Sequence, residues 1–250
     1  MDHIHTENKE DLRCTAIVLA AGSGTRMGGL VRKQYLHLGG KPILSYCLET
    51  FAESDVITDI VLVVPEGEGE YVRETVISAV PQAREKIRKI ISGGEQRYDS
   101  VHAGLQAIDW RCDYVFIHDG ARPFIDEDSL QKLLQVVKEE GACVAGMPSK
   151  DTVKIADAEG HVGSTPDRSR VWIIQTPQVF SYELIRGAYE ALADRLAADR
   201  GAGRGVTDDA MVLESETGHP VKLVEASYKN IKITTPEDLL IAEAFLRDTK

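Results

Sequence analysis

The residues best suited to chemistry in this chain are glycines and basic residues gathered near its N-terminus. The chain has 40 acidic residues in 250, so about six would be expected between residues 12 and 48, yet this stretch has none. It contains AAGSGTRMGG (20–29) and, shortly afterwards, Lys33. Glycine-rich turns expose backbone N–H groups that bind anions, and basic side chains neutralise them. The stretch therefore indicates a phosphate-binding loop.

Two familiar phosphate loops do not fit this spacing. A dinucleotide fingerprint would need glycine at position 27, which is Met27, and a P-loop would need lysine after Gly29, which is followed by Leu30. A backbone nest over 22–25 remains, with Arg26 and Lys33 beside it. A carboxylate about 4 Å from a bound triphosphate would cost several kcal/mol at an effective dielectric of about 20. The alternative is a plain turn with solvated basic residues.

The totals of the chain narrow its class. A hydrophobic content of 43% and a charged content of 28% are typical of a globular protein with an ample core. The net charge of −11 argues against a nucleic acid or a membrane surface as partner. There is no signal-peptide pattern and no 18-residue apolar run, and the four cysteines are widely spaced. We therefore expect a cytoplasmic protein with reduced thiols.

Strand-like and helix-like segments alternate along the first 147 residues. We expect strands at 15–20, 60–64, 86–91, 114–118 and 142–147, and helices at 43–52, 71–79, 98–108 and 128–139. Strands such as AIVLA and IVLVV are almost wholly apolar, as in sheets covered on both faces. This order predicts an α/β fold: a Rossmann-like, doubly wound, mostly parallel sheet. The glycine-rich loop would then lie at the carboxyl edge of the sheet, where such folds bind ligands.

The alternation breaks after Met147. Residues 149–180 contain short β-like pieces without a helical period, so we expect a protruding β-arm over about 149–176. Helices resume at 182–195 and 208–216, and a strand at 221–225 precedes a final helix at 236–246. No shift in composition marks a second domain. We predict a disordered tail over 1–13 and a single domain over 14–250.

Six motifs in a fixed order resemble those of a known family. They are LAAGSGTRMG with KQYLHLGGKP, HDGARP (118–123), KDTVK (150–154), DRSRVWIIQTPQVF (167–180), TDDA (207–210) and NIKITTPEDL (230–239). The set is similar to the 2-C-methyl-D-erythritol 4-phosphate cytidylyltransferase family, a cytidylyltransferase group of the nucleotidyltransferases, over nearly the whole chain. The resemblance implies transfer of CMP from CTP to 2-C-methyl-D-erythritol 4-phosphate, with release of pyrophosphate, in the non-mevalonate route to isoprenoid precursors.

The resemblance also implies roles for individual residues. Arg26 and Lys33 would be catalytic, neutralising the charge that grows on the α-phosphate. Asp119 and Asp208 would hold Mg²⁺ or another divalent cation. The nucleotide would be bound by Ala20, Ala21, Gly22, Ser23, Gly24, Thr25, Gly94, Glu95, Ser100 and Lys232.

The remaining roles belong to the acceptor. The resemblance implies that the arm reaches a second subunit, where Thr152 and Arg168 bind the polyol phosphate, with Arg122 as a further substrate-binding residue. The expected partners are therefore CTP, a polyol phosphate and, through the β-arm, a second copy of the chain. Two departures stand out: Arg32 occupies a position where the family commonly has proline, and Glu95 replaces the usual aspartate.

Other interpretations of these residues stay open at this point. Asp119 and Gly94 could serve turns, Asp208 could cap a helix, and the arm could be purely structural. Other acceptors are compatible with the chemistry, as in a ribitol 5-phosphate cytidylyltransferase or a sugar-1-phosphate nucleotidyltransferase. A noncatalytic nucleotide-binding protein is a further alternative, although it would be expected to have lost part of the charged set, which is complete here.

Overall fold

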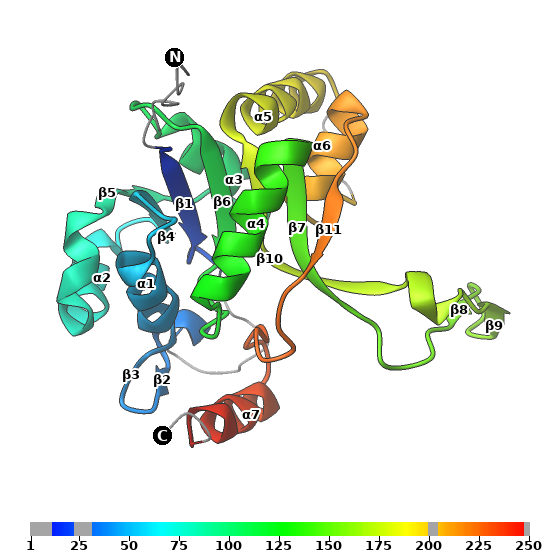
Figure 1. Cartoon of the computed structure of the whole chain (residues 1–250), viewed down its shortest axis with the longest axis horizontal. Helices are drawn as coiled ribbons and strands as arrows, with labels where there is room; N and C mark the ends of the chain where they lie inside the picture. The colour runs from blue at the N-terminus through cyan, green and yellow to red at the C-terminus, as the bar shows by residue number, and fades with distance from the viewer. Residues whose placement is uncertain (1–11, 23–31, 200–204, 248–250) are drawn as a thin grey trace, which may run out of the picture.

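The computed structural model describes residues 12–22, 32–199 and 205–247, and its centre is a seven-stranded sheet (Figure 1). From edge to edge the strands are β11 (Lys222–Glu225), β7 (Ala142–Pro148), β10 (Trp172–Ser181), β6 (Tyr114–Asp119), β1 (Cys14–Leu19), β4 (Asp59–Val64) and β5 (Ile87–Ser92). Every neighbouring pair is parallel except the two that involve β10. The predicted α/β fold with a mostly parallel sheet is confirmed.

The five strands predicted for the first part of the chain are all present, each within one residue of the expected ends. Their apolar runs have a structural reason, because helices cover both faces of the sheet. One face packs against α1 (Ile43–Glu53), α2 (Gly69–Thr75) and α4 (Glu127–Glu140). The other packs against α3 (Arg97–Gln106), α5 (Tyr182–Ala198) and α6 (Asp209–Thr217). The helix expected at 71–79 is shorter, because a 3₁₀ turn (Ile77–Ala79) follows α2.

The end of the chain returns to the carboxyl edge of the sheet. The helix α7 (Pro236–Arg247) packs against a small hairpin of β2 (His37–Leu38) and β3 (Lys41–Pro42). Leu38, Ile43, Ile233 and Ala242 form the buried cluster between them. The segment before α7 is thereby held beside the turn that follows β6, where the Ile233 amide donates to the Ala121 carbonyl at 2.9 Å.

The predicted arm is present but shorter than expected. It leaves the body after β7, carries the two-stranded pair β8 (Ile155–Ala156) and β9 (Val162–Ser164) at its tip, and returns at residue 171 (Figure 1). Residues 172–176, which the sequence pattern places in the arm, begin β10, and this strand lies antiparallel between β7 and β6. The prediction was wrong there because strand pairing with residues 24 to 28 positions away has no local signal.

Two other expectations can be compared with the structure. Residues 1–11 of the predicted tail lie outside the described residues, whereas Arg13 forms an ion pair with Asp59 at 2.7 Å. All four cysteines are free, as expected. No helix in the described ranges combines the length and apolar character needed to cross a bilayer.

Candidate active site

A cavity of about 350 Å³ opens at the carboxyl edge of the sheet, where the loop after β1 meets the end of β6. Parallel pairing places Leu19 beside Asp119, so residues 100 positions apart reach the cavity together. The chain continues from β1 to β4 on one side while β6 lies on the other, which is the switch point where doubly wound sheets bind ligands. Its lining residues are Leu19, Ala20, Ala21, Gly22, Lys33, Gln34, Gly94, Glu95, Gln96, Arg97, Ser100, Asp119, Ala121 and Lys232.

The first wall is the start of the glycine-rich loop. Ala20, Ala21 and Gly22, which we expect to bind the nucleotide, line the cavity, while 23–26, which include the expected catalytic Arg26, lie outside the described residues. Ser23, Gly24 and Thr25, which we also expect to bind the nucleotide, belong to this undescribed segment. Gln34 shapes this wall: its buried amide Nε2 donates to the Ala20 carbonyl at 2.5 Å and to the Gly22 carbonyl at 3.2 Å. Gln34 lies within the motif KQYLHLGGKP, but a glutamine side chain gives no sign in the sequence that it will hold the loop after β1.

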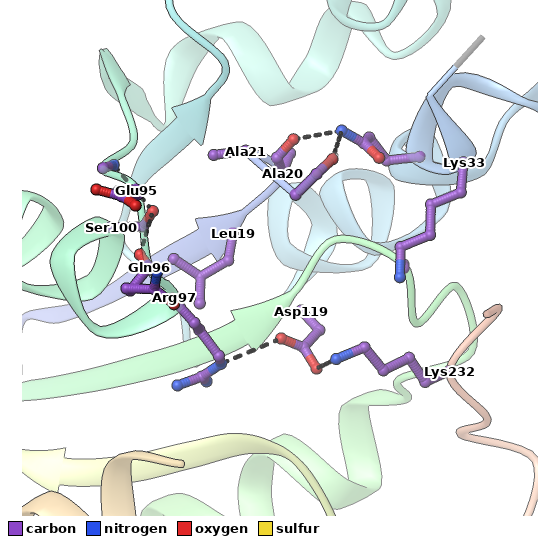
Figure 2. A pocket seen from close by; sticks show the side chains of 14 residues that line it. Leu19, Ala20, Ala21, Lys33, Glu95, Gln96, Arg97, Ser100, Asp119 and Lys232 are labelled. Atoms are coloured by element: carbon purple, nitrogen blue, oxygen red, sulfur yellow. Dashed lines mark hydrogen bonds and ion pairs between the residues drawn. The ribbon is translucent and has the colours of Figure 1, made fainter. Parts of the chain in front are cut away.

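Lys33 opens a short 3₁₀ turn (Lys33–Tyr35), and its ammonium group points into the cavity above Asp119 (Figure 2). Arg32, at the position where the resemblance implies proline, has φ −63°. That is the value that a proline ring imposes, so the departure keeps the backbone conformation. The Arg32 side chain forms an ion pair with Glu68 at 2.8 Å. This ion pair holds the backbone directly before Lys33, in place of the rigidity that a proline ring would give.

The opposite wall is the turn before α3. Gly94, Glu95 and Ser100, which we expect to bind the nucleotide, line the cavity there, and the Gly94 amide donates to Ser100 Oγ at 3.1 Å. The first turn of the helix is closed by the Gln96 amide, which donates to the Asp99 carboxylate at 2.9 Å. A Cβ atom added to Gly94 would lie 2.3 Å from Asp99 Cβ. The loop therefore needs glycine there for close packing.

Asp119 lies on the floor of the cavity, where three cations of the described residues approach it. Its carboxylate is 2.8 Å from Lys232 Nζ and 3.7 Å from Arg97 Nε (Figure 2). It is also 3.7 Å from Arg122 Nε. Burial alone would raise the pKa of Asp119, but Lys232, Arg97 and Arg122 together hold it well below the ordinary value. The carboxylate is therefore ionised at neutral pH and available as a ligand for a cation.

Arg97, which sequence reasoning missed, is fixed from behind by a buried acid. Its guanidinium binds the two Asp209 oxygens at 2.8 and 2.7 Å, and Tyr189 donates its hydroxyl to the same carboxylate at 2.6 Å. Burial lowers the pKa of Arg97, yet Asp209 outweighs it and raises that pKa above the ordinary value. The position of Arg97, three residues after Gly94 in a predicted binding turn, was the available signal. A rigid bidentate pair holds this positive charge at the cavity wall.

Four predicted residues are not brought to the cavity of their own chain. Asp208 caps α6, accepting from the Met211 amide at 2.9 Å and from Gln178 Nε2 at 3.0 Å. Arg122 is buried and does not line the cavity, and its Nη1 donates to the Asn230 carbonyl at 2.9 Å. Thr152 and Arg168 are both exposed on the arm.

The arrangement suits a polyanionic ligand. Lys33, Arg97 and Lys232 provide positive charge to the cavity, against Asp119 and Glu95 among its described lining residues. His118, directly before Asp119, is fully buried, and burial lowers its pKa to about 4, so that its ring is neutral. Backbone groups form one wall and cations another, which is the composition of a site that binds a nucleotide and aligns its phosphates.

Comparison with known proteins gives one consistent result. The family model for 2-C-methyl-D-erythritol 4-phosphate cytidylyltransferase matches residues 14–248. A protein of that name from Lachnoclostridium phytofermentans is 48% identical, over 94% of this chain and 97% of its own length. Among solved structures, 4-diphosphocytidyl-2C-methyl-D-erythritol synthase from Anaerococcus prevotii is similar at a TM-score of 0.81, with 34% identity over 94% and 96% of the two chains. The Francisella tularensis cytidylyltransferase superimposes at a TM-score of 0.73, with 31% identity over 93% and 99%.

Proposed function

The chain belongs to the 2-C-methyl-D-erythritol 4-phosphate cytidylyltransferase family, and from this premise we propose how its cavity carries out the reaction. The enzyme transfers CMP from CTP to 2-C-methyl-D-erythritol 4-phosphate in isoprenoid biosynthesis. The products are 4-diphosphocytidyl-2-C-methyl-D-erythritol and pyrophosphate. The observation that carries the mechanism is the cluster of fixed cations around Asp119 at the switch point of the sheet.

The reaction brings two anions together. An oxygen of the acceptor phosphate attacks the α-phosphorus of CTP, a new P–O bond forms, and the bond from the α-phosphorus to the bridging oxygen breaks as pyrophosphate leaves. No covalent bond to the protein is required, so catalysis rests on alignment and charge. Lys33 and Lys232 approach the floor of the cavity from one side and Arg97 from the other (Figure 2). These three would neutralise phosphate oxygens, together with Arg26 of the glycine-rich loop.

The nucleotide is proposed to lie across the loop after β1 and the turn before α3. Backbone groups of Ala20, Ala21 and Gly94 would distinguish cytosine, which offers an amino donor where uracil offers an acceptor. Gln34 supports this assignment, because it fixes the direction of the Ala20 and Gly22 carbonyls. Ser100 and Glu95 lie on the facing wall, where the ribose would be held.

Mg²⁺ is the proposed cofactor, and the donor set fits it. The described residues contain no group of three His, Cys, Asp or Glu side chains that would enclose a metal. Mg²⁺ is usually held by one or two carboxylates together with substrate phosphates and water, and Asp119 offers an ionised carboxylate in that setting. When bound, the ion would neutralise phosphate oxygens of CTP. Asp208 stays a prediction as the second ligand. Its oxygens accept hydrogen bonds from the Met211 amide and Gln178 Nε2, and at least one of these bonds would have to yield to the metal.

We propose that the acceptor site is completed by a second copy of the chain. Thr152 and Arg168 lie on the arm, which projects from the body (Figure 1), and neither lines the cavity of its own chain. Ile155 and Val162 at the arm's tip are 55% and 62% exposed, as expected of side chains that are covered in a dimer. Arg168 would offer a planar pair of donors to the acceptor phosphate.

We place the enzyme in the cytoplasm, which the four free cysteines support.

Mixed dimers test this arrangement. Arg168→Ala and Lys33→Ala subunits should each be inactive alone, because each lacks one part of every site. If the arm of one subunit completes the site of the other, equal mixing restores about a quarter of the wild-type activity, since half of the dimers are mixed and each has one intact site. No recovery after confirmed subunit exchange would show that each chain uses its own arm.

The reaction itself is tested by pyrophosphate release. Each nucleoside triphosphate is paired with 2-C-methyl-D-erythritol 4-phosphate, ribitol 5-phosphate or a sugar 1-phosphate, with and without Mg²⁺. We expect product only from CTP with the first acceptor, and only with a divalent cation. Product from ribitol 5-phosphate alone would contradict the acceptor and leave the cytidylyl transfer intact.

A further inference from the structure

Behind Asp119 lies a pair of buried polar residues to which the proposed reaction gives no role. His118 is 0% exposed and Thr176 is 4% exposed, and neither lines the cavity. His118 is the last residue of β6 before Asp119, and Thr176 lies in the neighbouring β10. The His118 ring is also packed edge-on against Phe51, with ring centroids 5.2 Å apart. Buried polar groups of this kind are expected to be hydrogen-bonded.

Their hydrogen bonds run in one direction. The Asp119 amide donates to Thr176 Oγ1 at 3.0 Å, Thr176 Oγ1 lies 3.1 Å from His118 Nδ1, and His118 Nε2 lies 3.2 Å from the Arg122 carbonyl. A carbonyl oxygen only accepts, so Nε2 must hold the proton of the neutral ring. Nδ1 is then an acceptor, and the Thr176 hydroxyl donates to it. With the proton on Nε2 and the Thr176 hydroxyl donating to Nδ1, the Asp119 amide, the Thr176 hydroxyl and both His118 nitrogens all have hydrogen-bond partners.

These bonds close behind the turn that places Asp119. The sequence of bonds leaves the backbone at Asp119 and returns to it at Arg122, and the Arg122 amide donates to the Asp119 carbonyl at 3.0 Å within the same turn. The turn also supplies Ala121 to the cavity wall. Fixing its two ends therefore fixes the direction in which the Asp119 carboxylate projects.

Thr176 also connects this turn to the segment of Lys232. Its carbonyl accepts from Asn230 Nδ2 at 2.9 Å, and the Asn230 carbonyl accepts from Arg122 Nη1 at 2.9 Å. Asn230 is 1% exposed and stands two residues before Lys232. One threonine thus links the backbone under Asp119 to the segment that carries Lys232, which forms an ion pair with Asp119 at 2.8 Å.

We propose that Thr176 and His118 are positioning residues, which hold the turn from Asp119 to Arg122 so that the Asp119 carboxylate meets the metal and phosphates in one orientation. The inference rests on the proposed function and adds to it two residues that touch neither substrate. Groups that orient a ligand residue typically contribute 10- to 100-fold to metal affinity or activity. Loosening the turn should therefore weaken both.

A matched pair of variants tests the hydroxyl. Thr176→Val keeps the shape and removes the hydroxyl, which leaves the Asp119 amide and His118 Nδ1 without their partner. We expect turnover to fall roughly 10- to 100-fold and the affinity for Mn²⁺, titrated by calorimetry into the CTP-saturated enzyme without acceptor, to fall by a similar factor. Thr176→Ser should restore both. Wild-type affinity for Mn²⁺ in a folded Thr176→Val enzyme, or a loss that Thr176→Ser does not restore, would overturn the proposal.

Histidine NMR gives a reading that does not depend on activity. The ¹⁵N shifts of His118 in the wild-type protein should show a proton on Nε2, because the Arg122 carbonyl can only accept. An Nε2 without a proton would break the bond to the Arg122 carbonyl and overturn the proposal. This result and the Mn²⁺ affinity stand apart from the acceptor: an enzyme inactive with every acceptor refutes the proposed function but leaves these two measurements able to decide the role of Thr176.

Discussion

The packing of Gly94 leads to a prediction whose size follows from the structure. In Gly94→Ala the new Cβ would lie 2.3 Å from Asp99 Cβ, and ordinary carbon contacts start near 3.4 Å. Asp99 Cβ is attached directly to the first turn of α3, so no rotamer can relieve the clash. The backbone on one side must move by roughly 1 Å, and a misplacement of about that size can lower an enzymatic rate about 100-fold. Overpacking of this kind costs about 1–3 kcal/mol of stability.

The movement would open the wall that faces the nucleotide. The bond from the Gly94 amide to Ser100 Oγ is already 3.1 Å long and would be broken by a further 1 Å. We therefore expect a higher KM for CTP, a roughly 100-fold lower kcat/KM and a melting temperature lower by roughly 2–12 °C. Steady-state kinetics with varied CTP and thermal unfolding followed by circular dichroism measure these effects.

Gly187→Ala is the matched control. Gly187 lies inside α5 on an exposed face, and nothing lies within 4 Å of a Cβ added there. The same substitution should stabilise the protein by about 0.5–1 kcal/mol and leave the kinetics unchanged, because alanine favours a helix interior. If Gly94→Ala melts and reacts like the wild type, the turn before α3 does not shape the nucleotide site as argued.

Three further predictions concern the charged residues. Lys33→Ala should lower turnover 100-fold or more at saturating substrates, because it removes charge that stabilises the transition state. The control Lys132→Ala, on the exposed face of α4, should change turnover little. An unchanged turnover in Lys33→Ala would show that Lys33 has no role in the mechanism. Asp119→Asn should abolish the acceleration by divalent cations without weakening the binding of metal-free CTP, as measured by calorimetry, since it removes a negative charge from the cavity; retained activation by Mg²⁺ would exclude Asp119 as the ligand. The third follows from the pKa of Asp119, which its cations depress against burial: its ion pairs stabilise the folded state fully above about pH 4 and lose this effect as the pH falls further. Denaturant unfolding of wild type and Asp119→Asn should therefore differ less as the pH falls below 4, and a constant difference would contradict the depressed pKa.

Local patterns of the chain determined its architecture and one half of its site. Apolar runs such as AIVLA and IVLVV predicted their strands to within one residue, because a strand buried on both faces needs a continuous apolar segment. The glycine-rich loop and the acid at the end of a strand were visible for the same local reason, and Ala20, Lys33, Gly94 and Asp119 do line one cavity. The ordered motifs indicated the family, which the comparisons show.

Only the tertiary structure decided which residues support that site. It placed β10 between β7 and β6, and this pairing brings Thr176 against Asp119 from 57 positions away. In the structure Asp208 caps α6, whereas its neighbour Asp209 forms the ion pair with Arg97. The sequence does not show which of two adjacent aspartates takes which role. The physical reason is that a buried polar group acts through the partner it finds. Partners in strands and loops far apart in the chain are chosen by register and packing, which no local pattern encodes.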